Sequence, residues 1–159
     1  ERHGALPAQV EMLLNNQENI QRFANRYLAA KDVFFIGRGV DHAISMEGSL
    51  KLKEISYIHS EAYAAGELKH GTISLIEEGT LVAAVLTQEN LYKKMISNMV
   101  EVRTRGAFVM AVNSGRKHRS RTGGGLCDLY PGDEQIFYQF AGDHPAAAVC
   151  LLYIHRAGL

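Results

Sequence analysis

The side chains best suited to acid–base chemistry lie in one stretch near residue 50. Glu47, Lys51 and Glu54 are spaced i, i+4 and i+7, so in an α-helix they would share one narrow face. A carboxylate beside an ammonium group can move a proton while the cation stabilises developing negative charge. The same spacing is typical of solvent-exposed ion pairs, each worth about 0.3 kcal/mol. The spacing alone leaves catalysis and surface ion pairing open.

A second candidate is His70, at the end of a short charged turn that begins at Gly66 and is followed by Gly71. Histidine is the side chain best suited to proton transfer near neutral pH. A single histidine in a loop is more often incidental, so the residue type by itself does not decide its role.

The third candidate is the turn formed by Gly37, Arg38 and Gly39, which follows an apolar run and is expected to bind substrate. Ligands gather at the carboxyl ends of strands in open α/β sheets, and two glycines let the backbone approach a ligand closely. Arg38 could bind an anion there or serve as an ordinary surface arginine. His42 stands where a dinucleotide fingerprint needs its third glycine, and no P-loop string occurs, so no cofactor is predicted.

No metal site is expected, because the seven histidines show no ligand spacing and Cys127 and Cys150 form no Cys-x-x-Cys pair. The two cysteines are typical of buried free thiols in a reducing compartment. No signal peptide and no apolar stretch of about 18–20 residues is present. These features predict a cytoplasmic protein without a membrane partner.

The elements that must position these residues follow from three continuous apolar runs, at 33–36, 81–86 and 107–112. Continuous runs are typical of strands covered on both faces. Helical periodicity fills the intervals, and strands alternating with helices indicate a parallel sheet. We therefore predict an α/β sandwich with helices at about 42–58 and 91–105, further helices at about 6–30 and from Asp143, and weaker strands at 59–63 and 126–130.

Length and charge limit the function classes. The chain has 159 residues, with 17 basic and 17 acidic side chains, so it is long enough for one domain and lacks the basic excess of a nucleic-acid binder. A basic and glycine-rich segment at 116–125 is expected to be a solvated loop, with a phosphate or nucleic-acid contact as the alternative.

The string FIGRG and the string MEGSLKLKEISYIHSEAYAAGELKHGT, between Phe35 and Leu75, resemble one family. They are similar to the second sugar isomerase (SIS) domain of the glutamine–fructose-6-phosphate aminotransferases. The resemblance is looser over 79–112, weak over 113–143, and returns in the final string AVCLLYIHRAGL. It implies a SIS-type three-layer αβα sandwich with a five-stranded parallel sheet, formed by residues 1–159 as a single domain.

The resemblance also implies a reaction, in which fructose 6-phosphate and ammonia from glutamine yield glucosamine 6-phosphate. Glu54 would shuttle the proton between sugar carbons 1 and 2, with Lys51 beside it and Glu47 in support. His70 would assist ring opening and reach the site of a neighbouring subunit, which implies a homodimer. The partner would be a sugar phosphate, fructose 6-phosphate or glucosamine 6-phosphate.

Several parts of that family have no counterpart in this chain, which opens at Glu1. They are the glutaminase domain, the first SIS domain with its phosphate-binding loop, and a C-terminal tail with an imine-forming lysine. We therefore expect a piece of a larger enzyme that is inactive alone. A noncatalytic sugar-phosphate-binding or dimerisation module, and a related SIS deglycase or ketose-phosphate isomerase, are the alternatives.

Overall fold

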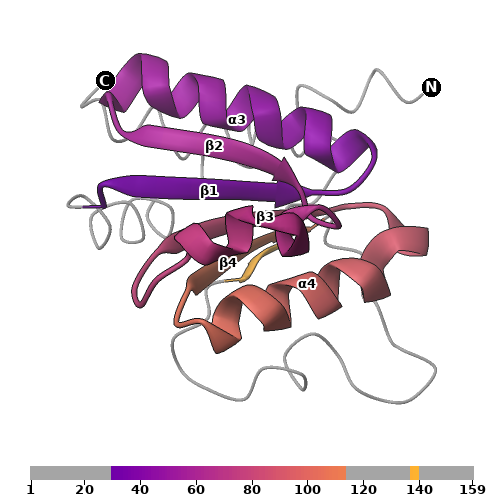
Figure 1. Ribbon diagram of the computed structural model, residues 1–159. Helices are drawn as coiled ribbons and strands as arrows, with labels where there is room; N and C mark the ends of the chain where they lie inside the picture. Colours follow the sequence, from indigo (N-terminus) through magenta and orange to yellow (C-terminus); the bar gives the residue numbers. More distant parts are fainter. Residues whose placement is uncertain (1–29, 114–136, 140–159) are drawn as a thin grey trace, which may run out of the picture.

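The computed structural model describes residues 30–113 and 137–139, in which strands alternate with helices (Figure 1). In chain order the elements are β1 (Asp32–Gly37), α3 (Val40–Ser56), β2 (His59–Ala64), the 3₁₀ turns η2 (Leu68–His70) and η3 (Thr72–Leu75), β3 (Leu81–Leu86), η4 (Glu89–Leu91), α4 (Tyr92–Thr104), β4 (Phe108–Asn113) and β5 (Phe137–Gln139). The three apolar runs predicted as strands, the weaker strand at 59–63 and the two helices between strands are confirmed, with ends that differ by at most two residues.

The strands form one parallel sheet in the order β2-β1-β3-β4-β5. Strand β3 is buried at all six positions and β1 at its last five. Both strands lie inside the sheet and are covered on both faces, which is why their sequences are continuous apolar runs rather than alternating ones. The predicted α/β class with a parallel sheet is confirmed.

Helix α3 covers one face of the sheet, and α4 covers the other together with η2 and η3 (Figure 1). Successive residues of a strand point to opposite faces. Phe35 accordingly packs with Leu52 of α3, and its neighbour Ile36 belongs to the core that contains Leu68 and Met99. This alternation divides the apolar interior into two layers, one on each side of the sheet.

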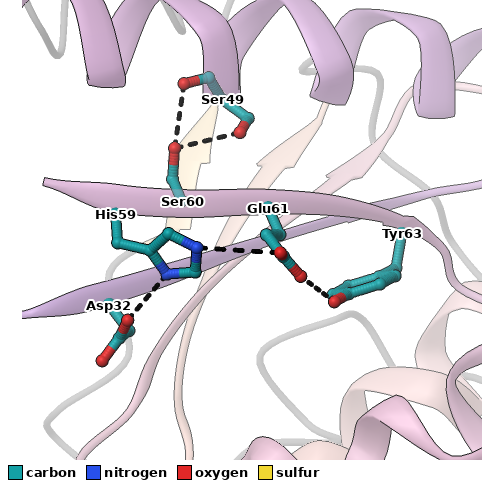
Figure 2. Close-up of polar contacts among 6 residues, drawn as sticks. All are labelled: Asp32, Ser49, His59, Ser60, Glu61 and Tyr63. Carbon is teal, nitrogen blue, oxygen red and sulfur yellow. Dashed lines mark hydrogen bonds and ion pairs between the residues drawn. The ribbon is translucent and has the colours of Figure 1, made fainter.

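Strand β2 forms one edge of the sheet, and its side chains make different contacts on its two faces (Figure 2). Ser60 faces α3: its hydroxyl donates to the carbonyl oxygen of Ser49 at 2.9 Å, and the two hydroxyl oxygens lie 2.9 Å apart. On the other face, Nδ1 of His59 lies 2.8 Å from a carboxylate oxygen of Asp32 on β1. The buried serine pair joins α3 to the edge strand.

Other predicted elements lie outside the described residues. They are the helices at 6–30 and from Asp143, the strand at 126–130 and the basic segment at 116–125. Strand β5 lies further along the chain, pairing with the last three residues of β4. Among the described helices, none is long and apolar enough to cross a membrane.

Candidate functional site

The turn after β1 lies at the point of the sheet where ligands are expected. From β1 the chain passes through α3 to β2 on one side, and it then returns to β3 on the other side of β1. The gap between the carboxyl ends of β1 and β3 is therefore a topological switch point, where open α/β sheets bind ligands. The turn is tight at Gly37, because a Cβ atom there would lie 2.4 Å from the carbonyl oxygen of Asp41.

Hydrogen bonds from the residues after β3 hold this turn. The Asp41 carboxylate is buried and accepts from the backbone N–H of Thr87 at 2.8 Å and from its hydroxyl at 2.5 Å. The side-chain amide of Gln88 donates to the carbonyl oxygen of Arg38 at 2.6 Å. The predicted substrate-binding turn is thus fixed to the end of the neighbouring strand.

The side chain of Arg38 is directed to α4. Its Nε and Nη2 atoms donate to Oδ1 of Asn98 at 3.1 and 3.0 Å, and its guanidinium lies against Gly66. Asn98 is only 2% exposed. The guanidinium therefore binds an amide of the protein itself, and its contact with a substrate anion stays a prediction.

The structure brings the three charged residues of α3 together as their spacing predicted. Nζ of Lys51 lies 2.8 Å from Oε2 of Glu54 and 3.7 Å from Oε1 of Glu47. The three side chains are between 36% and 52% exposed, so water and a ligand can reach them. A cation held between two carboxylates is suited both to proton transfer and to surface ion pairing.

His70 lies on the other side of the sheet from this row. It ends the turn η2, whose Leu68 is buried in the core shared with α4, whereas Leu52 of α3 belongs to the opposite core. Helix α3 begins at Val40, at the carboxyl edge of the sheet, and the turn with His70 follows β2 at that same edge. Glu54 lies about 21 Å further along the helix, at 1.5 Å per residue. Within one chain the structure does not bring Glu54 and His70 together.

The imidazole of His70 is exposed, and a carboxylate oxygen of Glu67 lies 3.9 Å from its Nε2. The turn is therefore open to a partner molecule. The described part of the chain contains no group of three or more His, Cys, Asp or Glu side chains that could hold a metal ion.

The sequence analysis did not single out Asp41 and Asn98, which fix the turn after β1 and the side chain of Arg38 at the carboxyl edge of the sheet. Asn98 lies among Met95, Met99 and Val102 on the buried stripe of α4. A polar residue in an apolar stripe is a signal that it needs buried hydrogen-bond partners. Asp41 gave a weaker signal, because acidic residues are common in the first turn of a helix.

A parallel sheet between helices, with polar turns at the carboxyl edge of its strands, defines an α/β domain of the type that binds ligands at strand ends. The model of the SIS domain matches residues 27–115, which is more than half of the chain. The chain belongs to the SIS domain family.

Curated relatives match the same region. The chain is 63% identical over 106 residues to a glutamine–fructose-6-phosphate aminotransferase [isomerizing] of Caldanaerobacter subterraneus, with 67% of this chain and 17% of the relative covered. The protein of the same name from Methanosarcina acetivorans is 50% identical over 107 residues, again with 67% and 17% covered. The chain thus spans about a sixth of the length of these relatives.

Solved structures agree with the fold. The C-terminal domain of glucosamine-fructose-6-phosphate aminotransferase from Francisella tularensis superposes with a TM-score of 0.75 at 32% identity, covering 94% of this chain and 42% of that one. A tagatose-6-phosphate ketose/aldose isomerase from Escherichia coli gives a TM-score of 0.67 at 17% identity, covering 96% and 40%. The second likeness concerns the fold alone.

Proposed function

We propose that the chain supplies part of the isomerase half of a glutamine–fructose-6-phosphate aminotransferase. That half would convert fructose 6-phosphate and ammonia from glutamine to glucosamine 6-phosphate. The observation that carries the proposal is the Glu47–Lys51–Glu54 row, because these groups suit proton transfer and lie in the segment matched to relatives of that name.

In the proposed reaction, Glu54 removes the proton from one of sugar carbons 1 and 2 and returns it to the other. The Lys51 ammonium, 2.8 Å from the Glu54 carboxylate, offsets the charge of the enediol-like intermediate. Glu47 holds Lys51 from the opposite side, at 3.7 Å. His70 of a second copy exchanges a proton with the ring oxygen as the sugar opens, and the Gly37–Gly39 turn of that copy binds part of the substrate, because within one chain this turn lies about 21 Å along α3 from Glu54.

The proposed enzyme is a homodimer. Since Glu54 and His70 lie on opposite faces of the sheet, the imidazole that serves a given Glu54 must come from a second copy. An apolar stripe beside the charged row supports this arrangement. Met46 and Leu50, spaced i and i+4 on α3, are 50% and 44% exposed, and Tyr57, which follows the end of the helix, is 92% exposed.

The test is a chimera in which this chain replaces the matching segment of the Caldanaerobacter enzyme, to which it is 63% identical. We expect the chimera to form glucosamine 6-phosphate, and Glu54→Gln to abolish that activity while glutamine hydrolysis and sugar-phosphate binding persist. Glu77→Gln, an exposed carboxylate in the connection between η3 and β3, is the control and should be active.

Turnover by the Glu54→Gln chimera at the unaltered rate would exclude the proposed base. Binding of fructose 6-phosphate by a chimera that never turns it over would favour the noncatalytic sugar-binding module. A chimera that interconverts sugar phosphates without using ammonia would favour the ketose-phosphate isomerase.

A further inference from the structure

The turn that carries His70 is joined to two distant elements by a chain of polar contacts. Arg38, after β1, donates to Oδ1 of Asn98, whose amide nitrogen donates to Oε2 of Glu101 at 3.3 Å. The other carboxylate oxygen of Glu101 lies 2.5 Å from Nζ of Lys69, the residue before His70. One continuous path therefore connects the end of β1, helix α4 and the turn.

The residue at the centre of this path is buried, so water cannot replace its hydrogen bonds. Asn98 is 2% exposed, and a buried amide must find its partners within the protein. Arg38 satisfies its oxygen, and Glu101 accepts from its nitrogen. The Glu101–Lys69 pair is more exposed, and an isolated pair of that kind adds little stability. Here Asn98 already orders the Glu101 carboxylate, so less conformational entropy is lost when Lys69 pairs with it.

The same network contacts the turn at its other end. A methyl group at Gly66 would lie 3.0 Å from Nη2 of Arg38, so the guanidinium packs directly against the backbone there. Between these two contacts, Leu68 is 1% exposed and anchors the turn in the core. Leu68 fixes how deeply the turn sits, and the polar contacts at Gly66 and Lys69 fix its rotation about that anchor.

We infer that Arg38, Asn98 and Glu101 are positioning residues for His70. They hold the turn so that the exposed imidazole projects in one direction from the carboxyl edge of the sheet. The inference rests on the proposed role of His70 in opening the sugar ring. It gives Arg38 a role that differs from the substrate contact predicted from the sequence.

The first arm of the test measures the order of the turn in the 159-residue chain by heteronuclear NOE of the backbone amides. Asn98→Leu and Glu101→Gln are expected to lower the NOE values of residues 66–71 while those of β1 and β3 stay unchanged. Lys94→Gln, exposed on the same helix, is the control. A turn as ordered as in the unaltered chain would overturn the inference.

Two variants of Lys69, at the far end of the network, test the inference even if Asn98→Leu does not fold. Lys69→Met removes the ion pair without touching the core, whereas Lys69→Arg keeps the positive charge. We expect the methionine variant to loosen the turn and the arginine variant to restore its order. Equal NOE values in the two variants would also overturn the inference.

The second arm measures kcat/KM of the chimera on fructose 6-phosphate and on 5-deoxyfructose 6-phosphate, which lacks the hydroxyl that closes the furanose ring. Glu101→Gln and Asn98→Leu should lower kcat/KM at least tenfold on the first substrate and less than threefold on the second. An equal loss on both would mean a merely structural role and would contradict the inference. His70→Asn with unaltered activity would instead refute the proposed function, and the NOE comparison would still decide whether the network orders the turn.

Discussion

The carboxylate of Asp41 accepts two hydrogen bonds from Thr87, one from the backbone N–H and one from the hydroxyl, although 46 residues separate them in sequence. Asp41 lies in the first turn of α3, the helix after β1, and Thr87 follows β3. Their contact holds together the carboxyl ends of two neighbouring strands, at the position where the fold is expected to bind a ligand.

Asp41→Ala should therefore lower the free energy of unfolding by about 2 kcal/mol, because it leaves two donors of Thr87 without their buried acceptor. Thr87→Val keeps the backbone hydrogen bond and should lose only about 1 kcal/mol. Urea denaturation of the two variants measures the difference. A larger loss in Thr87→Val than in Asp41→Ala would contradict the assigned geometry.

The serine pair between α3 and β2 predicts an asymmetry between two conservative changes (Figure 2). Ser60→Ala removes a donor to the Ser49 carbonyl and also leaves the buried Ser49 hydroxyl without its partner. Ser49→Ala leaves the Ser60 hydroxyl bonded to that carbonyl. We expect Ser60→Ala to be the more destabilising by about 1 kcal/mol. The double variant should lose less than the sum of the two, and strict additivity would argue against the pair.

Thr72 offers a stabilising change. Its hydroxyl oxygen is buried and has no hydrogen-bond partner in the part of the chain that the structure describes. Thr72→Val removes this group at nearly constant volume, so thermal unfolding should show a gain of about 1 kcal/mol. The neighbouring Ser74→Ala is the opposite control, since the Ser74 hydroxyl donates to the Gly71 carbonyl at 2.7 Å. A gain in Ser74→Ala as well would show that the effect is not specific to Thr72.

Alanine substitutions at two glycines measure steric crowding and backbone strain separately. An alanine at Gly37 would place its Cβ atom 2.4 Å from backbone atoms of the helix, which cannot move cheaply. At Gly79 the surroundings are open within 4 Å, but φ is +79°. We expect Gly37→Ala to lose about 3 kcal/mol or more and Gly79→Ala about 1.5 kcal/mol, both measured by chemical denaturation. The reverse order would mean that the turn at Gly37 can relax.

The order of the described elements could be predicted from the sequence because buried parallel strands leave a simple pattern. The run 81–86 is apolar at every position, and the structure buries every one of those side chains. The charged row of α3 was equally predictable, since helical spacing alone places Glu47, Lys51 and Glu54 on one face. These features depend only on local geometry.

The contacts of Arg38 depend on tertiary structure and could not be read from local patterns. Its partner Asn98 is 60 residues away, and only the packing of α4 on the sheet brings the two together. The separation of His70 from Glu54 likewise follows from which face each connection crosses. The SIS resemblance predicted that a neighbouring subunit would be needed, and the two-sided arrangement of this chain supplies a physical reason for that expectation.

The placement of Glu54 and His70 on opposite faces has a genetic consequence. In the proposed homodimer, a Glu54→Gln chain and a His70→Asn chain are each inactive, yet together they contain one intact pair. Random mixing of the two chimeras makes half of the dimers mixed, each with one complete site, so activity should recover to about a quarter of the unaltered value. A defect in one copy of the gene could then be complemented by a different defect in the other.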